Sequence, residues 1–132
     1  MDHLVSNSMT NGSARLQLER VFKDFKNLPF PPSGKDKELQ DVHGVLILYD
    51  ADVAAAVSKI LQTPITSSDP GRLTGLREDR TLEAMIDRLV RKYPNGHEIG
   101  SVARQYANYY DMIKKVLRAA HLYLGSQGNK SL

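Results

Sequence analysis

The residues best able to bind a metal in this sequence are its histidines, His3, His43, His97 and His121. A di-iron helical bundle needs a glutamate three residues before a helical histidine, so that both ligands lie on one face. Gln40 and Arg118 stand at those positions before His43 and His121. The chain also has no cysteine, which excludes thiolate-bound zinc. We therefore predict no metal site.

The serines and glycines offer no better catalytic motif. No serine stands in the Gly-x-Ser-x-Gly turn that exposes a hydrolase nucleophile. The stretch 70–75 lacks the Gly-Lys-Ser/Thr ending of a phosphate-binding loop. We accordingly expect a non-enzymatic protein without a cofactor. A small enzyme or ligand-binding bundle, with a pocket under residues 63–79, is a third interpretation.

Basic residues are a stronger signal, because they gather in the second half of the chain. Residues 1–71 hold 7 Lys and Arg against 9 Asp and Glu, whereas residues 72–132 hold 11 against 6. Such a surface could attract a nucleic-acid backbone in a salt-dependent way, although an ordinary solvated surface is the plainer interpretation. The residues that would serve this alternative function are Arg88, Arg91, Lys92, Lys114, Lys115 and Arg118.

Four segments have the apolar spacing of amphipathic helices, and these elements must position any site. They cover residues 13–28, 36–62, 80–93 and 98–124. In the second and fourth segments the apolar residues alternate at spacings of three and four, which is the heptad pattern of packed helices. The seam of the second segment is Leu39, Val42, Leu46, Tyr49, Val53, Ala56 and Ile60. The seam of the fourth is Ile99, Val102, Tyr106, Tyr109, Ile113, Val116, Ala120 and Tyr123.

Two other structures compete with these long helices. Residues 44–50 could be a buried parallel strand, but no second β-branched run offers them a partner strand. Residues 98–107 resemble the first helix of a helix-turn-helix, which would make 108–110 the turn and 111–124 the recognition helix. No glycine stands in that turn and the heptad passes through it, so one continuous helix is the better interpretation.

Tyrosines in the two seams suggest a contact surface for another protein. The residues we expect to bind a partner are Tyr49, Val53, Tyr106, Tyr109 and Tyr110. A buried tyrosine hydroxyl needs a hydrogen-bond partner, so this seam is more polar than a Leu/Ile seam and resembles a recognition surface. At 1.5 Å per residue the long helices reach about 40 Å and the short ones roughly 20–25 Å. We therefore expect part of the long pair to stay uncovered.

Together these patterns predict an all-α protein, an antiparallel four-helix bundle with two long central helices and one long crossover loop. We expect the short helices to cover one side of the long pair. The expected domain is 13–125, between a disordered tail, 1–12, and a flexible tail, 126–132. No apolar run approaches the ~18 residues that span a bilayer, so we expect an intracellular, cytoplasmic protein without membrane contact. We expect an interaction module, an adaptor or assembly subunit, that binds another protein or a second copy of itself.

Overall fold

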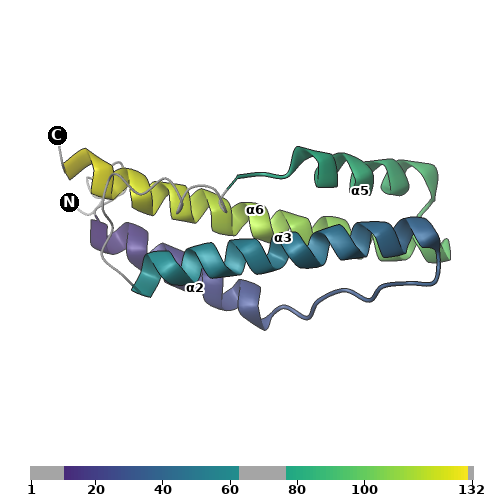
Figure 1. Ribbon diagram of the computed structural model, residues 1–132, viewed down its shortest axis with the longest axis horizontal. Coiled ribbons are helices and arrows are strands. Elements are labelled where there is room, and N and C mark those ends of the chain that lie inside the picture. The colour runs from purple at the N-terminus through teal and green to yellow at the C-terminus, as the bar shows by residue number, and fades with distance from the viewer. Residues whose placement is uncertain (1–10, 63–76, 131–132) are drawn as a thin grey trace.

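A computed structural model describes residues 11–62 and 77–130, with side chains over 12–62 and 77–125. These residues form four helices, α2 (Asn11–Asn27), α3 (Lys37–Gln62), α5 (Arg80–Lys92) and α6 (Glu98–Lys130) (Figure 1). The expected disordered tail, apart from its last two residues, and most of the 63–79 crossover lie outside the described residues. The described residues contain no strand, and α6 continues to Lys130, past its expected end at residue 124.

The helices alternate in direction along the chain, so the two long helices, α3 and α6, run parallel to each other (Figure 1). Contacts between them keep the same order in both helices: Tyr106 reaches Leu39, and Tyr109 reaches Asp50. Each short helix is antiparallel to α6. The predicted four-helix bundle with two long central helices is confirmed.

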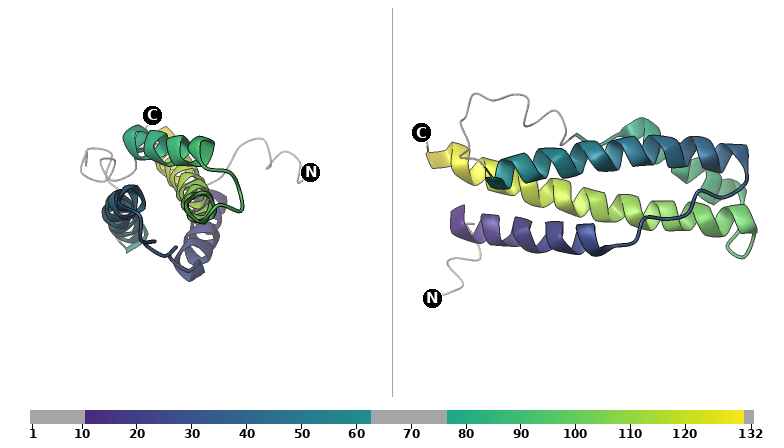
Figure 2. Two further views of the ribbon diagram at one scale, coloured as in Figure 1. Left: turned by 90° about the vertical axis from the view of Figure 1, so that its right-hand side faces the viewer. Right: turned by 60° about the horizontal axis from the view of Figure 1, so that its bottom comes forward.

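The short helices lie at opposite ends of the long pair and on opposite sides of it (Figures 1 and 2). Helix α2 packs along the C-terminal half of α6, and α5 packs along its N-terminal half; α2 and α5 do not touch. The prediction that both cover one side is therefore wrong. Because α2 and α5 cover different halves, the bundle has three helices in most of its cross-sections.

The heptad seam of α3 forms its buried face. The buried residues of this helix are Leu39, Val42, Leu46, Tyr49, Val53, Val57 and Ile60, which match the predicted seam except that Val57 takes the place of Ala56. The alternative strand over residues 44–50 is wrong, because all of these residues lie inside α3. Helix α6 is continuous through residues 108–110, so the helix-turn-helix alternative is also wrong. Neither long helix, nor any other described helix, is long and apolar enough to cross a membrane.

Two arginines bind carbonyl groups at the C-terminal ends of neighbouring helices, where the last turn leaves carbonyls without helical partners. Arg104 of α6 donates to the carbonyl oxygens of Val90 and Tyr93 at the end of α5, at 3.2 and 3.1 Å. Arg15 of α2 donates to the Leu61 carbonyl oxygen at the end of α3, at 2.8 Å. Each guanidinium group thus fixes the end of one helix against another.

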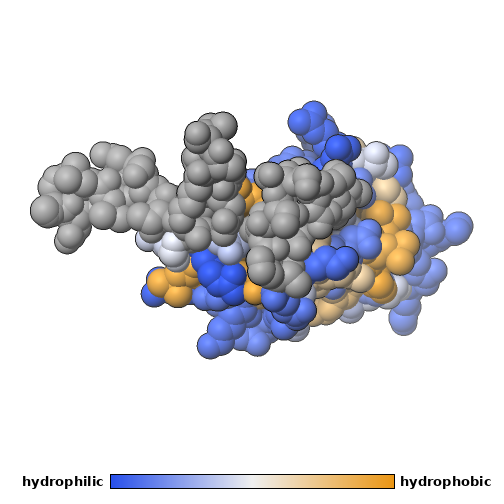
Figure 3. Space-filling model, turned by 60° about the vertical axis from the view of Figure 1, so that its left-hand side comes forward, coloured by the Kyte–Doolittle hydropathy of each residue, from blue (hydrophilic) through white to orange (hydrophobic). Residues whose placement is uncertain are grey.

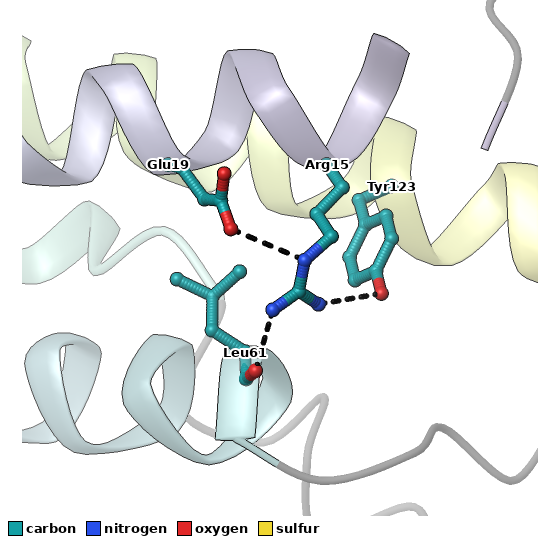
Figure 4. A network of polar contacts seen from close by, with 4 residues as sticks. All are labelled: Arg15, Glu19, Leu61 and Tyr123. Atoms are coloured by element: carbon teal, nitrogen blue, oxygen red, sulfur yellow. Dashed lines mark hydrogen bonds and ion pairs between the residues drawn. The ribbon is translucent and has the colours of Figure 1, made fainter. Parts of the chain in front are cut away.

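Replacing Arg15 with alanine is expected to lower the free energy of unfolding by about 1–2 kcal/mol. Its guanidinium group also reaches the Tyr123 hydroxyl and the Glu19 carboxylate, both at 3.1 Å, so it joins α2, α3 and α6 (Figure 4). The side chain is 39% exposed, and water therefore reduces what these bonds contribute. Urea denaturation measures the change, with Arg20→Ala on the exposed side of α2 as the matched control. Equal stabilities for the two variants would contradict the role given to Arg15.

Candidate functional site

The five residues expected to bind a partner all lie in the core of the chain. Tyr49, Val53, Tyr106, Tyr109 and Tyr110 are buried between the described helices. The rings of Tyr49 and Tyr110 stack with their centroids 5.9 Å apart, which closes the seam between α3 and α6. These residues therefore do not form the exposed surface that the sequence suggested, since α2, α5 and the connections cover them.

The tyrosine hydroxyls bind the chain itself, and three of them hold the connections against the core. The Tyr106 hydroxyl lies 2.8 Å from the Pro32 carbonyl oxygen, in the link between α2 and α3. Tyr49 donates to the Arg77 carbonyl oxygen at 2.6 Å, and Tyr110 donates to that of Asp79 at 3.2 Å. Both of these acceptors precede α5. The polar character of the seam thus serves the fold.

The fourth hydroxyl, that of Tyr109, joins the two long helices directly. It donates to Oδ1 of Asp50 at 2.6 Å. The rings of Phe25 and Phe30 pack on the Tyr109 ring, with centroids 5.7 and 5.0 Å away. Burial and the Asp50 carboxylate both raise the pKa of Tyr109 above its ordinary value of 10.0. The hydroxyl is therefore a hydrogen-bond donor that keeps its proton, as a structural contact requires.

The six basic residues suggested for nucleic-acid binding do not form one patch. Arg88 and Lys92, near the end of α5, face α3 and bind the two carboxylate oxygens of Glu38 at 3.0 and 3.6 Å. Arg91 pairs with Asp87 of its own helix at 2.9 Å. The other three residues lie farther along the bundle on α6. Carboxylates thus neutralise the α5 group, which weakens its attraction for a polyanion.

The α6 group of basic residues is also partly neutralised. Lys114 binds Glu83 of α5 at 3.0 Å, and this hydrogen bond is the main reason that the pKa of Lys114 is raised. Lys115 and Arg118 are exposed, at positions 100° and 40° around the helix from Lys114. Only part of the predicted surface therefore presents unpaired positive charge.

An exposed apolar face on α3 was missed in the sequence. We call it the outer α3 face, and its residues are Gly44, Ile47, Leu48, Ala51 and Ala55. Leu48 is 69% exposed and Ile47 is 45% exposed. Gly44, Leu48, Ala51 and Ala55 are spaced by four, three and four residues, which is a second heptad seam on the side of α3 that faces away from α6. That spacing was readable in the sequence beside the inner seam.

Figure 2 shows how the described helices lie around this face. In the end-on view of Figure 2, α2, α5 and α6 all lie on one side of α3, and no described helix lies on the other. Figure 3 shows that apolar residues reach the surface among hydrophilic ones. Asp52 is also exposed and lies 40° around α3 from Leu48, so one carboxylate borders this apolar strip between Asp41 and Lys59.

His43 takes part in local packing. His43 Nε2 lies 3.1 Å from the Pro31 carbonyl oxygen, and its ring contacts Phe30 edge-on, with centroids 5.2 Å apart. Over residues 11–62 and 77–130, no three His, Asp or Glu side chains lie together as a metal site would require. Within the known proteins, no family model, curated sequence or solved structure matches the chain. A function for this protein is therefore proposed from the geometry of the chain itself.

Proposed function

We propose that this protein is a non-enzymatic assembly module that associates with a second copy of itself through the outer α3 face. The observation that carries the proposal is the exposure of Leu48 and Ile47 within an otherwise apolar heptad seam. Burying such a strip against another helix removes apolar surface from water, and contiguous exposed apolar patches are typical of interaction sites. The small residues Gly44, Ala51 and Ala55 let the backbone of a second helix come close.

Charge at the ends of the outer α3 face favours a second copy as the partner. Asp41 stands at its N-terminal end and Lys59 at its C-terminal end, and both are exposed. In an antiparallel pair of α3 helices, Asp41 of each copy meets Lys59 of the other, whereas a parallel pair would bring like charges together. Within one copy Asp41 already pairs with the exposed Lys37 at 3.6 Å and Lys59 also has an interaction, so the contacts between copies would replace these. The charges at the two ends of the face are thus complementary to each other in the antiparallel pair.

A two-fold axis near residue 50 gives the register of this pair. Leu48 of one copy then lies opposite Ala51 of the other, and Gly44 lies opposite Ala55. Each large side chain therefore meets a small one, which is how packed helices interdigitate. The contact from residue 41 to residue 59 is about 27 Å long. One helix pair buries little area compared with obligate dimers, so the dimer should exchange with free monomer.

Replacing Leu48 with glutamate is expected to weaken the dimer at least tenfold, because two buried carboxylates would face each other near the axis. Sedimentation equilibrium from about 10 µM to about 1 mM measures the association, a range suited to a small interface. Leu16→Glu is the matched control, since Leu16 is 49% exposed on α2, outside the outer α3 face. A wild-type chain that stays monomeric over the whole range would overturn the proposal.

A charge exchange tests the register and direction separately. Asp41→Lys chains and Lys59→Glu chains should each associate more weakly than wild type, because each brings like charges together at both ends of the pair. Mixed in equal amounts they should form heterodimers, since every end contact is then between opposite charges. If the wild-type chain forms dimers but the two variants show no preference for each other, self-association is retained. The antiparallel α3 contact is then contradicted.

Nucleic-acid binding is a weaker alternative than self-association. Carboxylates pair with four of its six basic residues, Arg88, Arg91, Lys92 and Lys114. The tyrosines that could stack on bases are buried, so single-stranded nucleic acid would find no aromatic platform among them. Of the other two, Arg118 lines a groove beside the start of α5, where it lies with Arg77 and Arg80.

A further inference from the structure

A groove lies between α6 and the segment that leads into α5. Its volume is about 650 Å³. Arg77 and Arg80 line it from the α5 side, and Lys114 and Arg118 line it from α6. Basic side chains from two segments far apart in sequence therefore converge on one concave surface. None of them belongs to the outer α3 face.

Three of these cations are available to a ligand. Among the described residues, no carboxylate forms an ion pair with Arg77, Arg80 or Arg118, and all three are exposed. Lys114 is different, because it is bound to Glu83 at 3.0 Å. Glu78 is the one acidic residue of the lining. Three unpaired guanidinium groups against one carboxylate leave the groove with an excess of positive charge.

The start of α5 does not add a separate anion site to this charge. Asp79 is the N-cap of α5, and its Oδ1 accepts a hydrogen bond from the Leu82 amide at 3.0 Å. The capping carboxylate already occupies the position where an anion would bind the helix end. The attraction for a ligand therefore comes from the arginine side chains.

The α6 side of the groove also has an apolar surface. Leu117 is buried beneath it, and Leu122 is 44% exposed beside Arg118. An inorganic anion would leave this leucine surface in water. A ligand that carries both negative charge and an apolar or aromatic body would cover the surface and meet the arginines together.

We propose that this groove binds an organic phosphate with two or more phosphoryl groups, its body lying on the exposed side chain of Leu122. Guanidinium groups suit this ligand, because their planar N–H pairs match the spacing of phosphate oxygens and are always charged. Several phosphoryl groups allow more than one of the three arginines to bind at once. The body of the ligand supplies the apolar contact, which distinguishes it from a bare polyphosphate.

Titration of the purified chain with adenosine diphosphate and, separately, with pyrophosphate tests the proposal. Amide NMR shifts and calorimetry measure the binding. Adenosine diphosphate should bind more tightly than pyrophosphate and shift the amides around Leu117 and Arg118. Arg118→Ala should weaken both ligands about tenfold, as expected for loss of a charged hydrogen-bond donor. Arg20→Ala, an exposed arginine on α2, should weaken neither.

The Leu122→Ser variant tests the contact with the ligand body separately from the contact with the phosphoryl groups. It should weaken adenosine diphosphate severalfold and leave pyrophosphate unchanged, since only the nucleoside body meets the leucine surface. Equal affinity for the two ligands, or an equal loss in Arg20→Ala, would show nonspecific charge attraction and overturn the proposal, as would no binding of either. Repeating the titration on the Leu48→Glu chain keeps the result independent of α3 pairing.

Discussion

Replacing Gly100 with alanine is expected to lower the free energy of unfolding by about 2–3 kcal/mol, because backbone blocks the added methyl group. Gly100 is buried in the first turn of α6, against the turn that follows α5. A Cβ there would lie 2.7 Å from the Tyr93 carbonyl oxygen and would overlap the Pro94 carbonyl oxygen. Arg104 binds the same Tyr93 oxygen, so moving the turn would also strain that contact. The higher helix propensity of alanine, about 1 kcal/mol, offsets only part of the cost.

Gly44→Ala is the matched control for this substitution. Gly44 is also helical, but an added Cβ would meet nothing within 4 Å. Its replacement should raise the free energy of unfolding by about 0.5–1 kcal/mol through helix propensity alone. At low protein concentration both variants are monomeric, so urea denaturation compares their free energies of unfolding directly. If both substitutions changed stability in the same direction, the close approach at Gly100 would be contradicted.

The heptad spacing was sufficient to predict the long helices and the bundle. Leu39, Leu46, Val53 and Ile60 recur along one side of α3, and burying them requires other helices on that side. Spacing alone does not place the shorter helices along the long pair. Packing α2 and α5 at opposite ends of α6 lets two short helices cover both halves of one long helix. The helix lengths alone therefore predicted an uncovered tyrosine seam, whereas in the structure this seam is covered.

The exposed site was harder to predict, because its residues are interleaved with core residues. Leu46 and Tyr49 are buried, whereas Ile47 and Leu48 between them are exposed. A run of adjacent apolar residues suggested a buried strand. In a helix, however, neighbours are 100° apart, so such a run must place apolar side chains on two faces. The run itself therefore indicates a second apolar face on α3.

Raising the pH above about 10 is expected to unfold the protein, because four of its buried tyrosines resist ionisation only while it is folded. Burial, the largest cause, raises the pKa of Tyr106 and Tyr110 to about 12 and shifts that of Tyr49 and Tyr109 upward as well. Below the unfolded pKa of 10.0 both states keep these protons, and stability does not depend on them. Above it the unfolded chain releases protons first, so each tyrosine lowers the free energy of unfolding by about 1.4 kcal/mol per pH unit.

Four such groups remove on the order of 5 kcal/mol by pH 11, a large part of the stability of a domain of this size. Helix loss in far-ultraviolet circular dichroism should therefore coincide with the rise in tyrosinate absorbance at the same pH. Tyr106→Phe provides the comparison. It should lower stability at neutral pH by about 1 kcal/mol, because the Pro32 carbonyl loses its donor. It should also reduce the slope above pH 10 by about a quarter, since one titrating group is gone. Tyrosines that ionise near pH 10 while the helices persist would show that their hydroxyls are not held in the core.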